Sequence, residues 1–234
     1  MRSSSSFFAK PRAQFALGAS LLLLSSSATV ALDFEKLEGQ IQTVAKDAGE
    51  SCVSIHSTPQ DSWGSGVIVS NEGHIFSAAH VVEMVGEVVE IYFSNGTSHQ
   101  ATVEALDFDQ DLALLKFVSY RPAPEQVAVC ASQKMSAGGA CVAMGHAYGF
   151  DQERGAPVRF GLFSHESRRG NLMTTCRVAA GDSGGPLFNL EGELIAIHRT
   201  IDAGGRFTAH IPVKVFADQF ASAFIAEPIL VASL

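Results

Sequence analysis

The stretch GDSGGPL, residues 181 to 187, decides how the rest of this 234-residue chain is interpreted. It places one hydroxyl and one carboxylate among three glycines. Glycine adopts positive φ at little cost and lets another part of the backbone come close. A serine in such a loop can stay exposed while its own N–H and a neighbouring N–H point at one spot, which suits a nucleophile beside an oxyanion hole. A glycine-rich turn in an all-β protein would give the same letters, so the rest of the chain must supply a base and an acid.

His80 is the strongest candidate for the base. It ends the strand-like run IFSAAH, and the small residues before it leave room for an imidazole to pack closely. Histidine can accept a proton and return it near neutral pH. We interpret four other histidines as ordinary surface or core residues: His56, His74, His99 and His165.

The segment DFDQD contains the candidates for the acid, Asp107, Asp109 and Asp111. Asp111 directly precedes the apolar run LALLKF, and a carboxylate at the edge of a buried strand can be held rigidly enough to orient an imidazole. Asp107 and Asp109 lie in the preceding turn, where acids commonly cap and solvate. Asp111 is therefore the favoured orienting residue.

Short apolar or alternating runs between turns fill most of the chain after residue 50. They predict two sets of six strands, over 52–57, 64–70, 73–82, 88–94, 100–108 and 112–118, and over 127–131, 140–146, 157–163, 185–189, 193–200 and 207–213. The proline-containing stretch 121–126 between them is the predicted linker. We expect an all-β fold of two six-stranded antiparallel barrels, about 50–120 and about 127–216. Helical spacing adds a helix over 33–49 and another over about 213–226.

Residues 1–31 have the pattern of a secretory signal peptide: a basic start, an apolar run and small residues at the end. An uncleaved membrane anchor is the alternative, but the apolar core is short for a spanning helix. Removing this segment, which holds three of the 16 basic and none of the 24 acidic residues, leaves a net charge of −11. We therefore expect a secreted or periplasmic protein without stable membrane association, and the acidic balance argues against nucleic acid as a partner.

Four cysteines remain after such a cleavage: Cys52, Cys130, Cys141 and Cys176. They allow three pairings, and an oxidising compartment permits disulfides. Cys130 and Cys141 could close a short loop, whereas Cys52 and Cys176 fit single buried thiols. None of the four has the CxxC spacing of a zinc site, so no metal and no cofactor is expected.

Three blocks in order, GSGVIVSNEGHIFSAAHVV, DFDQDLALLKF and GDSGGPLFNLEGELIAI, resemble the trypsin-like serine proteases, most closely the bacterial HtrA/Deg branch. The resemblance covers about residues 51–213. It implies a serine endopeptidase acting on proteins or peptides, with His80 as general base, Asp111 as its orienting acid and Ser183 as nucleophile. It also implies an oxyanion hole made by the N–H groups of Gly181 and Ser183.

The chain departs from the family pattern in two respects. HtrA proteins typically carry a PDZ domain after the protease domain, and we expect none here because only about twenty residues follow Val213. Asp182 stands where many HtrA chains have asparagine, and no new N-terminus of the digestive type is apparent to pair with it. We therefore expect Asp182 to have another partner. HtrA relatives often trimerise through an N-terminal segment, so a homo-oligomer is a further possibility.

Substrate-binding candidates are Arg177, six residues before Ser183, together with His198 and Arg199 in LIAIHRT. A histidine at the position of His198 resembles bacterial glutamyl endopeptidases, and a cationic pair would favour an acidic side chain at P1. The alternative is that Arg177 points to solvent and His198 only lines the pocket. At the level of the whole protein, the alternative to the protease is a catalytically silent homologue that binds peptides or proteins in the same cleft.

Overall fold

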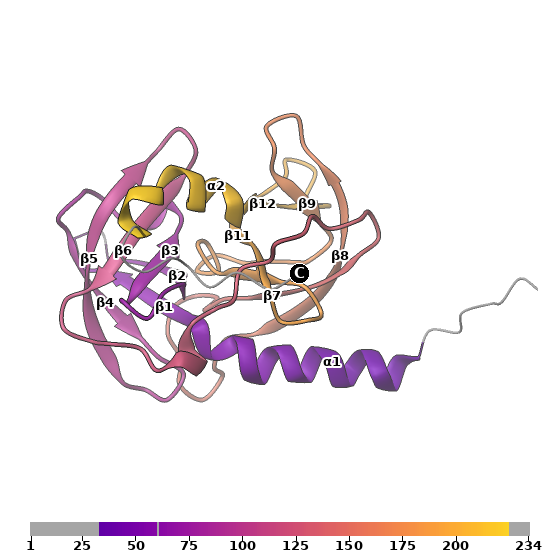
Figure 1. The fold of residues 1–234 in the computed structure, drawn as a ribbon, viewed down its shortest axis with the longest axis horizontal. Helices are drawn as coiled ribbons and strands as arrows, with labels where there is room; N and C mark the ends of the chain where they lie inside the picture. The colour runs from indigo at the N-terminus through magenta and orange to yellow at the C-terminus, as the bar shows by residue number, and fades with distance from the viewer. Residues whose placement is uncertain (1–32, 60, 225–234) are drawn as a thin grey trace, which may run out of the picture. The chain divides into compact units, whose positions relative to one another are not determined.

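The computed structural model describes residues 33–59 and 61–224 (Figure 1). The first barrel is closed in the order β1–β2–β3–β6–β5–β4, and every neighbouring pair is antiparallel. Its strands are β1 (Cys52–Ser57), β2 (Ser62–Ile68), β3 (His74–Ser77), β4 (Val88–Tyr92), β5 (Ser98–Asp107) and β6 (Leu112–Phe117). Alternating residues of these strands fill its interior, as the pleat requires.

The second barrel is closed in the order β10–β11–β12–β9–β8–β7. Its strands are β7 (Ala140–Met144), β8 (Val158–Glu166), β9 (Leu172–Thr174), β10 (Pro186–Phe188), β11 (Leu194–Ile201) and β12 (Thr208–Pro212). The predicted fold class, two six-stranded antiparallel barrels with a helix at each end, is thereby confirmed.

One predicted strand is wrong and one strand was missed. Residues 127–131 form no strand but a connection that touches both barrels: Ala128 N–H donates to Ile68 O at 2.9 Å, and Cys130 makes an isolated bridge to Leu194. Val127, Ala128 and Cys130 are buried by this position between the barrels rather than by a ladder. The sixth strand is instead β9, whose three residues between polar flanks are too few to give a period.

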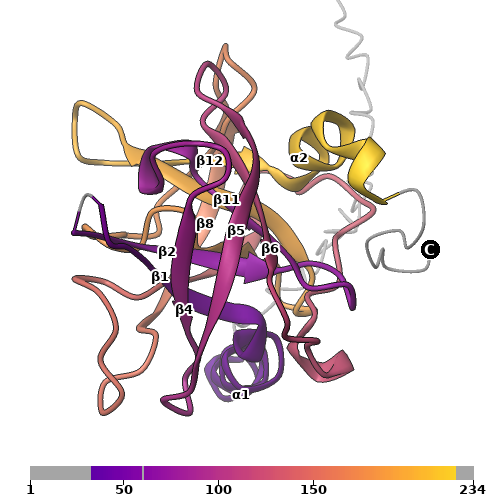
Figure 2. The same ribbon diagram turned by 90° about the vertical axis from the view of Figure 1, so that its left-hand side faces the viewer.

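Two helices cover the barrels (Figures 1 and 2). Helix α1 (Phe34–Asp47) packs through Val44 against the core that includes Val142 and Met144 of β7. Helix α2 (Val213–Gln219) follows β12 directly, and its Phe216 packs in a tilted arrangement against Phe76 of β3 with ring centroids 4.8 Å apart. Burying a phenylalanine contributes about 2–3 kcal/mol. Helix α2, which belongs to the second half of the chain, therefore stabilises the attachment of one barrel to the other.

Within residues 33–59 and 61–224, neither helix is long and apolar enough to cross a bilayer. The predicted signal peptide, residues 1–31, lies outside the described residues.

Candidate active site

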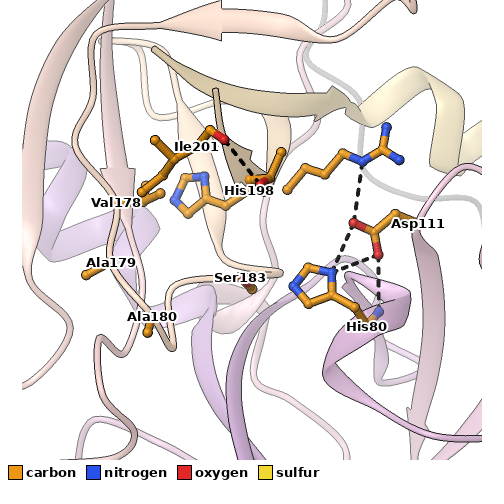
Figure 3. A pocket seen from close by; sticks show the side chains of 10 residues that line it. His80, Asp111, Val178, Ala179, Ala180, Ser183, His198 and Ile201 are labelled. Atoms are coloured by element: carbon orange, nitrogen blue, oxygen red, sulfur yellow. Dashed lines mark hydrogen bonds and ion pairs between the residues drawn. The ribbon is translucent and has the colours of Figure 1, made fainter. Parts of the chain in front are cut away.

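The structure brings His80 and Asp111 together at the edge of the first barrel (Figure 3). His80 Nδ1 lies 2.9 Å from Asp111 Oδ1 and 3.0 Å from Oδ2. The backbone N–H of His80 also donates to Asp111 Oδ1, at 3.1 Å. The carboxylate thus fixes the tautomer with the proton on Nδ1, which leaves Nε2 as the free base. The side chain of Asp111 is 12% exposed and that of His80 48% exposed, so the acid is sheltered and the base is accessible.

Local backbone geometry explains how Asp111 reaches the histidine. Asp111 has φ +65, a left-handed conformation that aspartate tolerates better than most residues. His80 lies on the 3₁₀ turn Ala79–Val81, and the N–H of Ala79 donates to the carbonyl of Asp111 at 3.2 Å. Backbone and carboxylate of Asp111 therefore hold the same short turn.

Arg199 contacts the other side of the same carboxylate. Its Nε lies 3.5 Å from Asp111 Oδ2, and its side chain is 20% exposed. This residue begins the exposed end of β11 and also lines the pocket described below. Asp111 accordingly has a cation on one side and the imidazole on the other.

Ser183 lies in the loop before β10, and close approach forces this loop to be glycine-rich. Gly181 has φ +90, and a Cβ there would lie 2.5 Å from the nitrogen of Tyr148. Gly184 has φ +82, and a Cβ there would lie 2.2 Å from the carbonyl oxygen of Ser65. Neither position can accept a side chain without displacing backbone, which explains the glycines on either side of the serine.

The peptide between Ala180 and Gly181 is oriented by the neighbouring loop. The carbonyl of Ala180 accepts a hydrogen bond from Tyr148 N–H at 2.7 Å. In a trans peptide the N–H points opposite to the carbonyl, so the Gly181 N–H faces away from Tyr148. Within the described part of the chain, no residue accepts from the N–H of Gly181 or of Ser183. Both donors are available for an oxyanion.

Asp182 finds its partner in Arg159 of β8. Arg159 Nη2 lies 2.9 Å from Asp182 Oδ2, which also accepts from the N–H of Ala179 at 2.6 Å. Asp182 is completely buried, and among residues 33–59 and 61–224 its Oδ1 has no hydrogen-bond partner. Burial raises the pKa of Asp182, while the Ala179 N–H and the Arg159 guanidinium oppose this effect. The ion pair lies directly behind the candidate oxyanion hole and ties it to the second barrel.

Ser65 of β2 connects the first barrel to the same loop. Its N–H donates to Ser183 O at 2.8 Å, and its hydroxyl donates to Gly181 O at 2.8 Å. The hydroxyl also accepts from His146 N–H at 2.8 Å. One residue of the first barrel thus holds, through its backbone N–H and its hydroxyl, both residues whose N–H groups would form the oxyanion hole.

A pocket of about 470 Å³ opens beside these groups. His80, Asp111 and Ser183 contribute to it, and Figure 3 shows the imidazole of His80 between Asp111 and Ser183. The remaining wall comes from the segment before the serine and from β11: Val178, Ala179, Ala180, His198, Arg199, Thr200 and Ile201. The wall is mostly apolar, with one arginine.

His198 belongs to a buried chain of hydrogen bonds. Its Nδ1 lies 2.9 Å from Nδ1 of His210, and its Nε2 lies 3.0 Å from Met144 O. His210 Nε2 in turn lies 2.8 Å from Thr174 Oγ1. Because Met144 O only accepts, His198 must donate from Nε2 and accept at Nδ1, and His210 must donate from Nδ1. Burial lowers the pKa of His198 to about 3 and also lowers the pKa of His210, so both rings are neutral and neither nitrogen of His198 is free for a ligand.

Arg177 is exposed and does not line the pocket. Among the described residues, no hydrogen bond joins Ser183 to His80, although both line the same pocket. The structure does not bring together Cys130 and Cys141, the pair that could have closed a short loop: Cys141 contacts Cys176, and Cys130 lies in the connection between the barrels.

Sequence reasoning missed Arg159, Ser65 and His210. Arg159 had a detectable signal: strand alternation places it on the same face of β8 as Gly161 and Phe163, which are buried. A charged residue on the inner face of a strand requires a buried counter-charge. Ser65 and His210 gave no such signal. Their partners lie 116 and 12 positions away in the sequence, and no local pattern indicates that these residues interact.

Comparisons with known proteins agree with this geometry. The family model described as "Trypsin-like peptidase domain" matches residues 64–197. A "Probable periplasmic serine endoprotease DegP-like" of Halomonas elongata is 33% identical over 70% of this chain and 35% of its own length. The "Periplasmic pH-dependent serine endoprotease DegQ" of Escherichia coli is 31% identical over 63% of this chain and 33% of its own. The chain therefore spans about a third of the length of these relatives. Among solved structures, a serine endoprotease from Yersinia pestis matches with a TM-score of 0.68 and 26% identity, covering 80% of this chain and 67% of that one.

Proposed function

The chain belongs to the family of trypsin-like peptidase domains, and from this we propose that it is an exported serine endopeptidase using His80, Asp111 and Ser183. The observation that carries the proposal is the bidentate contact of His80 with Asp111 in a pocket that Ser183 also lines. The names of its relatives, which are periplasmic serine endoproteases, support the activity and the location. The leader-like residues 1–31 support export.

In the proposed mechanism, Ser183 Oγ attacks the carbonyl carbon of the scissile bond while His80 Nε2 takes its proton. The N–H groups of Gly181 and Ser183 donate to the oxyanion that forms. His80 then returns the proton to the leaving amine, and an acyl-enzyme remains on Ser183. Water, activated by the same imidazole, hydrolyses this ester. Asp111 holds the Nδ1 tautomer throughout and stabilises the imidazolium.

For substrate choice, we propose that the pocket beside Ser183 receives the P1 side chain. Arg177 is too exposed to contribute there, and both nitrogens of His198 are bound to protein atoms. An acidic preference would therefore rest on Arg199 alone, whose guanidinium already contacts Asp111. A matched pair of peptides with valine or glutamate at P1, tested on the wild type and on Arg199→Ala, measures this contribution. Equal glutamate cleavage by both proteins would remove the acidic hypothesis.

One observation favours the alternative of a silent homologue that binds peptides. Ser183 and His80 are not joined by a hydrogen bond among the residues described. Catalytic hydrogen bonds in free enzymes are often long and shorten when substrate binds, so this geometry leaves the protease as the better-supported function.

A fluorophosphonate probe tests the proposal, because it reacts covalently only with an activated serine. The wild type is expected to be labelled on Ser183, and Ser183→Ala is expected to remain unlabelled. Ser164→Ala, at a half-buried position of β8 that does not line the pocket, is the matched control and should label like the wild type. Absence of labelling in a folded wild type, with and without added peptide, would favour the binding protein instead.

A further inference from the structure

Two buried thiols of the second barrel lie in contact. Cys141 Sγ of β7 is 3.7 Å from Cys176 Sγ, although the residues are 35 positions apart. Cys141 is 0% exposed and Cys176 1% exposed. A disulfide has an S–S distance of about 2.05 Å, so closing the gap requires the sulfurs to approach by about 1.6 Å. Rotation of the two side chains would have to supply this movement.

The backbone around the pair leaves room for this contact. Cys141 pairs with Gly161 of the neighbouring strand β8, and the chain at Cys176 passes directly over that glycine. A Cβ on Gly161 would lie 2.5 Å from Cys176 N and 2.7 Å from its Sγ. Glycine at this position therefore allows the two cysteines to meet.

We propose that Cys141 and Cys176 form a disulfide when the protein folds in an oxidising compartment. The surroundings argue that this happens before the barrel closes. In the folded protein both thiols are buried among apolar residues, so an external disulfide cannot reach either sulfur. Thiol–disulfide exchange needs direct contact between the attacking and the attacked sulfur, so the folded dithiol reacts slowly.

The chemistry balances with a disulfide oxidant such as oxidised glutathione. One cysteine thiolate attacks a glutathione sulfur, breaks its S–S bond and releases one glutathione thiolate. The second cysteine thiolate attacks the protein sulfur of this mixed disulfide and releases the other. The protein loses two protons and two electrons, and one oxidised glutathione becomes two reduced molecules.

The crosslink would stabilise the pocket beside Ser183. Cys176 begins the segment that leads through Val178 to the oxyanion loop, and its carbonyl accepts from Thr208 Oγ1 at 2.5 Å. Cys141 begins the strand β7 that ends at Met144, whose carbonyl accepts from His198. A bond between them would join two walls that otherwise meet only through hydrogen bonds and packing.

The test is refolding of the urea-unfolded full chain in a buffer of reduced and oxidised glutathione, followed by alkylation in denaturant and peptide mapping. We expect two alkylated cysteines, Cys52 and Cys130, and one peptide pair linked through Cys141 and Cys176. Cys52→Ala and Cys130→Ala should keep the link, whereas Cys141→Ala and Cys176→Ala should lack it. The linked form should unfold at a temperature at least about 5 °C above the reduced form.

Four alkylated cysteines in the refolded protein, or a link between a different pair, would overturn the inference. If refolding fails, the same mapping on protein recovered from the oxidising compartment of an expression host decides between these outcomes. Fluorophosphonate labelling of the same samples separates this inference from the proposed activity. A linked but unlabelled protein would contradict the activity alone.

Discussion

Replacing Arg159 with methionine removes the only cation that contacts Asp182 Oδ2 within the described part of the chain. Asp182 is completely buried, and the Arg159 side chain is 19% exposed. Removing one partner of a buried ion pair costs about 3–5 kcal/mol, because the other charge stays uncompensated. If this cost falls on the arrangement of residues 179–183, it disfavours that arrangement by roughly 100- to 3,000-fold, at about 1.4 kcal/mol per factor of ten.

We therefore expect Arg159→Met to lower the second-order rate constant of fluorophosphonate labelling at Ser183 by a similar factor. Asp182→Asn is the matched partner, because an amide can still accept from Ala179 N–H without carrying a charge. Combined with Arg159→Met, it should recover most of the lost rate. Circular dichroism and thermal unfolding check that each variant is folded.

The pH dependence of stability gives a second measure of the same ion pair. Without Arg159, the pKa of Asp182 rises further, since the guanidinium is among the groups that oppose the effect of burial. When folding raises the pKa of an acid, the folded state loses stability as pH increases above the pKa of that acid in the unfolded chain, which is about 3.9 for aspartate. The difference in unfolding temperature between the wild type and Arg159→Met should therefore grow as pH rises above about 4. A folded Arg159→Met that labels at the wild-type rate would refute the reasoning.

Three further predictions concern the groups around this site. Asp111→Asn should lower the labelling rate of Ser183 by about 10⁴-fold, because the amide favours the wrong tautomer of the imidazole; a loss under tenfold would contradict the role of Asp111. Arg199→Ala should lower the same rate by about fivefold, which corresponds to an ion pair of about 1 kcal/mol. The substitution should have no effect when Asp111 is already asparagine. An equal effect in both backgrounds would show that Arg199 acts elsewhere. His146 is fully buried, and burial lowers its pKa to about 4 although a backbone contact with Cys52 opposes this effect. Unfolding therefore takes up a proton when pH lies between about 4 and 6.5. In that window His146→Leu should flatten the pH dependence of the unfolding free energy, measured by urea titration, by about 1.4 kcal/mol per pH unit. His165→Leu, at an exposed site, is the control and should leave the slope unchanged.

The fold was predictable because most strands carry their own local signal. β1, β6 and β11 appear in the sequence as apolar or alternating runs between turns, and the structure forms each of them. Residues 127–131 show the limit of this argument, because burial between two barrels produces the same apolar letters as a strand. The three-residue strand β9 shows the opposite limit, since it is held by pairing with β8 and β12 rather than by its own composition.

At the candidate site, sequence reasoning could name residues but not their partners. The motifs select His80, Asp111 and Ser183 because each lies in a distinct local pattern. The need of Asp182 for a partner was also visible, but its identity depends on how β8 lies against the loop. Likewise, the sequence predicted His198 as a substrate-binding residue. In the structure His198 is neutral and hydrogen-bonded to His210, and only the folded barrel brings these two residues together.

Ser65 makes the shape of the nucleophile loop a property of the assembled molecule rather than of either half. The loop lies in the second half of the chain, yet two of its carbonyls are held by a serine of the first. A chain that emerges from synthesis or export with only one barrel formed lacks these contacts. Its residues 181–183 are then not held by Ser65 in the arrangement that the complete molecule has. The immature polypeptide would then be inactive without an inhibitor and without a cleavage step, because the active site forms only when the two barrels dock.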